Sequence, residues 1–179
     1  MTMDAAFHRE QKQVAGGMAA AALIAIVAIG IALWQADGPA QPAAGRLATA
    51  LKLDLFVIVW LLASIGNVAR LRFFSAQDIA GSATTVATEA VRRGNAILQN
   101  TLEQAVLAVS VHLALAAILP DPRTLLTTLV VLFGLGRLLF WLGYARGAAG
   151  RAFGFALTFY PTAFALLAGL GLVLAGRAA

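Results

Sequence analysis

The chain alternates between long apolar stretches and short polar segments. The apolar stretches cover about residues 14–34, 47–69, 95–119, 124–144 and 152–176. About 20 mainly apolar residues are needed for an α-helix to cross the hydrocarbon core of a bilayer. We therefore predict five transmembrane helices. The first stretch is longer than the 7–15 apolar residues typical of a cleaved signal peptide, which is the alternative interpretation of this segment.

The segments between the stretches contain residues that end helices. Pro39 and Pro42 follow the first stretch, and Pro120 and Pro122 separate the third from the fourth. Proline cannot continue a helix, so both segments are predicted as turns or loops. Because the connection at Pro120 is short, we expect the third and fourth helices to be antiparallel neighbours.

Composition supports a membrane protein. The chain is 61% hydrophobic and 12% charged, whereas soluble domains are about 45–50% apolar and about 25% charged. The net charge is +5, but the basic residues lie at the ends of apolar stretches, which indicates a lipid bilayer rather than nucleic acid as the partner. The chain has no cysteine and two histidines. We therefore predict no disulfide, no thiol nucleophile and no metal site.

The distribution of basic residues predicts the orientation in the membrane. With a cytoplasmic N-terminus and an outer C-terminus, most of the arginines and lysines lie on the cytoplasmic side. The residues on that side are Arg9, Lys12, Arg70, Arg72, Arg92, Arg93, Arg146 and Arg151, against Arg46, Lys52, Arg123 and Arg177 on the other. The positive-inside rule favours this orientation of an integral, multi-pass protein.

Polar residues interrupt the third and fourth stretches. Asn100, Glu103 and Gln104 are spaced i, i+3 and i+4, so a helix presents them on one face. A carboxylate at the centre of a membrane helix costs about 2.5–3.5 kcal/mol, so Glu103 should face protein or water. By helical rise, Glu103 lies about 12 Å and Arg137 about 10 Å from the same end of the bundle. An internal Glu103–Arg137 ion pair is one interpretation, and a ligand site is the other.

Several cations follow Arg137 along the chain. Arg137 and Tyr144 are two helical turns apart and share a face, and Arg146 and Arg151 come next. Near Glu103, such cations suit an anionic ligand that carries an amine, with an amphipathic partner arriving from the lipid. Arginines that only fix the topology are the alternative interpretation for Arg146.

These motifs resemble a known family. The run Asn100-Thr101-Leu102-Glu103, followed by Arg137, by Gly143-Tyr144-Ala145-Arg146 and by Arg151, is similar to the membrane-associated proteins in eicosanoid and glutathione metabolism (MAPEG). The segment 69–78 also resembles the end of the first helix and the following loop of microsomal glutathione transferases. The resemblance covers about residue 47 to the C-terminus and suggests a bacterial-type member in the inner membrane.

The resemblance implies a fold and a function. Residues 46–179 would form a four-helix transmembrane bundle that assembles as a homotrimer, and residues 1–45 would add a polar head, one further transmembrane helix and a Pro/Gly loop. The implied activity is a glutathione-dependent transferase or peroxidase acting on a lipophilic small molecule. A non-catalytic bundle that keeps a Glu–Arg pair, or that binds another anionic lipid or thiol, is the alternative.

The resemblance also assigns roles to individual residues. Arg151 would stabilise the glutathione thiolate, Glu103 would bind the amine, and Asn100 would hydrogen-bond the ligand's backbone. Tyr144 would line the site. Candidates for binding the carboxylates are Arg93, Arg137 and Arg146.

The chain departs from the family pattern at three positions. The family often has an arginine where this chain has Ala96, a tyrosine in place of Gln104, and an aromatic hydroxyl in place of Phe140. Separately, His112 lies well inside the third stretch, where we expect it to hydrogen-bond a neighbouring helix.

Overall fold

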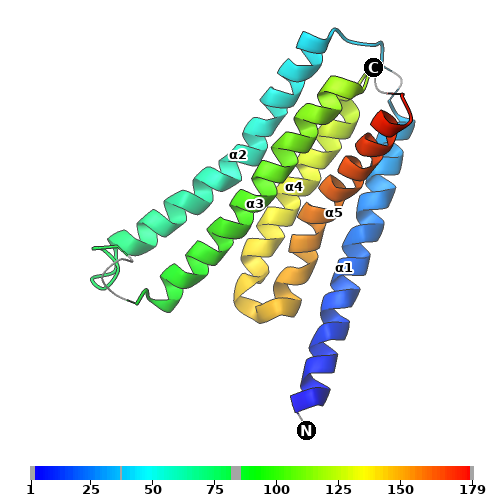
Figure 1. Ribbon diagram of the computed structural model, residues 1–179. Helices are drawn as coiled ribbons and strands as arrows, with labels where there is room; N and C mark the ends of the chain where they lie inside the picture. The colour runs from blue at the N-terminus through cyan, green and yellow to red at the C-terminus, as the bar shows by residue number, and fades with distance from the viewer. Residues whose placement is uncertain (1–2, 37, 82–85, 178–179) are drawn as a thin grey trace.

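The computed structural model describes residues 3–36, 38–81 and 86–177, and its regular structure there is entirely helical (Figure 1). Each predicted apolar stretch corresponds to one long helix. The helices are α1 (Met3–Trp34), α2 (Ala43–Phe73), α3 (Glu89–Ile118), α4 (Arg123–Gly143) and α5 (Gly147–Leu174), with a short 3-10 helix η1 (Tyr144–Arg146) between the last two. The first helix begins earlier than predicted and includes the polar head.

The helices have the length and composition needed to cross a membrane. Four helical stretches qualify, namely Asp4–Trp34, Ala43–Phe73, Glu89–Ile118 and Arg123–Leu174. The last contains α4, η1 and α5, which fold back on each other as an antiparallel pair (Figure 1). Large apolar side chains such as Leu55, Phe56 and Leu167 point outward and are exposed. The protein is therefore an integral, multi-pass membrane protein.

Helices α2 to α5 form a ring of four. Helix α2 packs along α3, α4 packs along α5, and contacts of α2 with α4 and of α3 with α5 complete the ring. Helix α1 lies outside this ring against α5 and α4. The N-terminal end of α1 and the C-terminal end of α5 lie at opposite ends of the molecule (Figure 1).

The prediction that α3 and α4 are close neighbours is wrong. The two helices are antiparallel, but they stand diagonally across the ring and approach each other at few positions. The connection after Ile118 begins with extended backbone at Leu119. The chain then crosses to the opposite side of the ring before α4 begins at Arg123.

Glycines allow α4 and α5 to approach each other closely. A Cβ atom added at Gly143 would collide with the backbone of Gly150, and one at Gly154 would collide with the backbone of Phe140. Small residues at such positions bring membrane helices into contact. Gly147, at the start of α5, has φ of 80°, a conformation that glycine adopts without strain. These glycines hold Tyr144 and Arg151 at the turn between the two helices.

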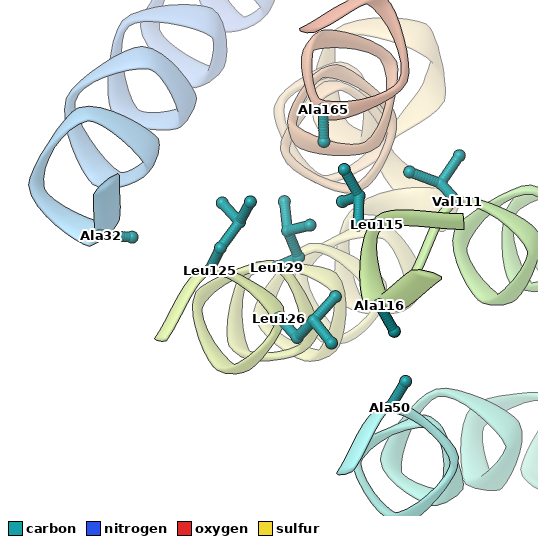
Figure 2. Packing of buried hydrophobic residues seen from close by; sticks show 9 residues of the cluster. All are labelled: Ala32, Ala50, Val111, Leu115, Ala116, Leu125, Leu126, Leu129 and Ala165. Carbon is teal, nitrogen blue, oxygen red and sulfur yellow. The ribbon is translucent and has the colours of Figure 1, made fainter. Parts of the chain in front are cut away.

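An apolar core fills the end of the bundle opposite η1. Side chains of α3 and α4 meet there, and alanines of α1, α2 and α5 surround them (Figure 2). The cluster consists of Ala32, Ala50, Val111, Leu115, Ala116, Leu125, Leu126, Leu129 and Ala165. Apolar packing therefore predominates at this end of the bundle.

A buried polar pair joins α2 to α3. His112 Nδ1 lies 2.6 Å from Asp54 Oδ1, and both side chains are 1% exposed. The expectation that His112 hydrogen-bonds a neighbouring helix is confirmed. Its partner was not predicted, because Asp54 lies beside the charged Lys52 near the start of the second apolar stretch and could be taken for an interfacial residue.

Candidate functional site

Two adjoining clefts open near η1, between α3 and the α4–α5 hairpin. The main cleft, of about 500 Å³, is lined by Asn100, Glu103, Phe140, Tyr144 and Arg151 among others. The basic cleft, of about 370 Å³, is lined by Glu89, Arg92, Arg93, Ala145 and Gly147. Ala96, Tyr144 and Arg151 line both. The two clefts can therefore hold different parts of one ligand.

The structure brings together five of the seven residues that the sequence singled out. Asn100, Glu103, Tyr144 and Arg151 line the main cleft, and Arg93 lines the basic cleft beside the last two. Two residues stand apart from the linings. Arg137 is fully buried, and Arg146 is exposed outside both clefts.

Glu103 faces the open side of the main cleft. It is exposed, and its Oε1 accepts a hydrogen bond of 2.9 Å from Gln99 Nε2 one turn earlier on α3. Over residues 3–36, 38–81 and 86–177 no salt bridge joins Glu103 to Arg137, so the internal ion pair considered from the sequence is not formed. The carboxylate of Glu103 therefore remains available to a cationic group of a ligand.

Arg137 lies behind Asn100. Its Nη1 donates to Asn100 Oδ1 at 2.8 Å and its Nε donates to Thr158 Oγ1 at 3.1 Å. The guanidinium also lies 4.4 Å from the centre of the Phe140 ring, a cation–π contact. A guanidinium only donates, so the bond fixes the Asn100 amide with its oxygen towards Arg137. The Asn100 nitrogen is left to donate to a ligand.

Arg151 lies near the start of α5, with its guanidinium over the ring of Tyr144 at 4.7 Å. The Tyr144 ring in turn meets Phe140 edge to face, with centroids 5.3 Å apart. Within the described part of the chain Arg151 has no carboxylate within salt-bridge distance. The N-terminus of a helix also carries partial positive charge. This part of the cleft therefore favours an anion.

The basic cleft is anchored at the start of α3. Glu89 pairs with Arg92 at 2.7 Å and lies 3.8 Å from Arg93. Hydrogen bonds from Thr88, the N-cap of α3, and from Ser75 hold the pKa of Asp78 below its usual value. These bonds tie the loop after α2 to the start of α3. They fix the position of the helix end that carries Arg93.

The three departures from the family pattern have different surroundings. Ala96 is exposed and lines both clefts, and Phe140 lines the main cleft. Gln104 instead is buried in the bundle, 6% exposed, and lines neither cleft. Only the first two positions could change a contact with a ligand directly.

Sequence reasoning missed several residues of the main cleft. Gln99 holds Glu103 in place, and Phe155 of α5 contributes an apolar wall. Val14 and Met18 of α1 also line this cleft. The i, i+4 spacing of Gln99 and Glu103 could have identified the first. Nothing in the apolar sequence of α1 distinguished Val14 and Met18 from residues that face lipid.

Comparison with known proteins gave one match. A family model described as "MAPEG family" matches residues 47–171. No curated protein and no solved structure matches the chain. The matched residues run from α2 almost to the end of α5 and include every residue singled out above for the clefts except Val14 and Met18.

Proposed function

The chain belongs to the MAPEG family, and on this premise we propose that it is a membrane glutathione-dependent transferase or peroxidase acting on a lipophilic electrophile. The main support is that Glu103 and Arg151 line one open cleft, with no ion-pair partner for either within the described ranges. Glutathione carries an amine, two carboxylates and a thiol. A free anion and a free cation on one cleft are complementary to such a ligand.

The groups around the clefts suggest how glutathione binds. The Glu103 carboxylate accepts hydrogen bonds from the amine of glutathione. The Asn100 nitrogen, whose orientation is set by the bond to Arg137, donates to a carbonyl of the tripeptide. Arg93, in the basic cleft, binds a carboxylate. Arg146 lies outside the linings and contributes charge at a distance, which steers an anionic ligand towards the clefts.

Arg151 is the proposed catalytic residue. A free thiol has a pKa of about 8.5, and a neighbouring cation or a helix N-terminus lowers it. Arg151 and the N-terminus of α5 would provide both. The thiol proton leaves to solvent, and the thiolate sulfur forms a bond to the electrophilic carbon. The leaving group departs with its electron pair. Tyr144, stacked under Arg151, holds the guanidinium in place.

Calorimetry of glutathione binding in detergent tests this proposal. Wild type is compared with Arg151→Ala and Glu103→Gln. Losing a charge-assisted hydrogen bond should weaken binding about tenfold or more in each variant. Arg123→Ala, at the opposite end of α4 and exposed, is the matched control and should bind like wild type. Ultraviolet absorbance of bound thiolate should rise in wild type and be lost in Arg151→Ala.

Two results would contradict the proposal. Wild type that binds no glutathione at millimolar concentration would mean that this chain keeps the family's fold with a different ligand or none. Binding that is equal in wild type, Arg151→Ala and Glu103→Gln would mean that glutathione lies elsewhere.

We also propose that the chain assembles as a homotrimer with glutathione between neighbouring subunits, as the family resemblance implies. Native mass spectrometry of the detergent-solubilised protein should then give three times the mass of one chain. A single-chain mass under conditions that preserve glutathione binding would contradict the trimer.

A further inference from the structure

Helix α1 contributes to the main cleft although the family match begins only at residue 47. Val14 and Met18 form part of the wall, alongside Ala148, Ala152 and Phe155 of the α5 side. All five side chains are apolar, whereas the side formed by α3 carries Asn100 and Glu103. Arg151 of α5 adds a cation among these α5 residues, so the cleft is apolar along α1, polar along α3 and mixed along α5.

The position of α1 is fixed by close packing against α5. Its buried face consists of small residues, Ala21, Ala25 and Ala32, each at most 1% exposed. Gly17 lies against the backbone of Phe153, and Met18 packs against the cluster around Ala21 and Leu157. Small residues let membrane helices approach closely. The wall that α1 gives to the cleft is thus part of the folded structure.

A groove continues from the main cleft along α1. It has a volume of about 410 Å³ and is lined by Phe7, Glu10 and Gln11 as well as Val14 and Met18. Val14, Met18 and Ala148 line both this groove and the main cleft. Glu10 and Gln11 add polar side chains to this groove between Phe7 and Val14, which are apolar. An amphiphilic molecule can therefore follow α1 from the membrane interface into the cleft.

We propose that α1 is the binding wall for the second substrate: the apolar part of the lipophilic electrophile lies against Val14 and Met18, and it enters along the groove at Phe7. This inference rests on the proposed function, in which Glu103 of α3 and Arg151 of α5 hold glutathione beside the wall that α1 forms. It makes α1, which lies outside the family match, the element that selects the electrophile by the size of its apolar part.

S-alkylglutathiones test this arrangement, because they carry the tripeptide and an apolar chain in one molecule. Calorimetry measures the affinity of the methyl, butyl and hexyl derivatives for the full-length protein. In wild type the affinity should rise about twofold per methylene, as for a methylene that is half covered by protein. Partitioning of the chain into detergent affects all variants equally, so ratios between variants remain comparable.

The variants remove apolar surface from α1. Met18→Ser and Val14→Ser should each reduce the rise in affinity from the methyl to the hexyl derivative, measured relative to the affinity of the same variant for S-methylglutathione. Leu23→Ser is the control, because Leu23 is 63% exposed on another face of α1. Its affinity should rise with chain length as much as that of wild type.

The outcomes separate the two proposals. If affinity rises equally with chain length in wild type, Met18→Ser and Val14→Ser, the proposed role of α1 is wrong. The proposed glutathione site is not affected by that result. Absence of binding of both glutathione and S-methylglutathione to wild type overturns the proposed function, and the role of α1 with it.

Discussion

At the scale of single residues, the direction in which a side chain points decides which contacts it makes. Asn100 and Glu103 lie on the same side of α3, yet only Asn100 hydrogen-bonds Arg137. Glu103 is turned towards the cleft and is held by Gln99. The buried guanidinium of Arg137 keeps the Asn100 amide oriented. The charged groups that would contact a ligand, Glu103 and Arg151, line the cleft instead.

Ala96 offers a test by gain of function. It is exposed where the two clefts meet, and the family often has an arginine at this position. Ala96→Arg should tighten glutathione binding about tenfold by adding a charge-assisted hydrogen bond to a carboxylate. Calorimetry beside Ala96→Met, which adds bulk without charge, measures the effect. Affinity that is unchanged or lower in Ala96→Arg would show that no ligand carboxylate lies near residue 96.

At the scale of helices, three pairs of helices are held together by three different kinds of contact. Glycines bring α4 and α5 together beside the site, and alanines bring α1 against α5. Helices α2 and α3 are joined by polar contacts as well, namely the Asp54–His112 pair and the bond from Arg46 to the carbonyl of Ala117. A polar side chain that is buried in a membrane protein needs a hydrogen-bond partner, whereas an apolar side chain does not.

The Asp54–His112 pair should therefore behave as a unit. Asp54→Leu or His112→Leu leaves a buried polar group without its partner and should cost about 1–3 kcal/mol of unfolding free energy. The double replacement by leucine should cost less than the sum of the two. Unfolding in detergent mixtures, followed by circular dichroism, measures all four proteins. Additive losses would mean that the two side chains have no interaction energy with each other.

At the scale of the whole molecule, charge and apolar surface are separated. The loops between α2 and α3 and between α4 and α5 lie at the same end of the bundle (Figure 1). This end carries Arg70, Arg72, Arg92, Arg93, Arg146 and Arg151. The sides of the bundle are apolar and exposed, as a surface in contact with lipid requires. The positive-inside rule predicts that the end with the arginines is cytoplasmic.

The absence of cysteine makes this orientation easy to test. Ala76 lies in the loop after α2 and Ala40 in the loop before it, and both are exposed. A membrane-impermeant maleimide applied to intact cells should label Ala40→Cys and should label Ala76→Cys only after the membrane is permeabilised. The reverse pattern would place the basic end, and with it the proposed site, outside the cell.

The sequence by itself determined the helices, the membrane class and four polar residues of the main cleft. Apolar length defines a membrane helix, and its spacing fixes which residues share a face, so Asn100, Glu103, Tyr144 and Arg151 could be selected in advance. Tertiary structure decided what each side chain meets. Whether Glu103 would pair with Arg137, whether Asp54 would find His112, and whether α1 would reach the cleft all depend on how helices are placed around the bundle. The reason is physical: helical periodicity is local, whereas the order and rotation of packed helices follow from the sum of many weak contacts between distant residues.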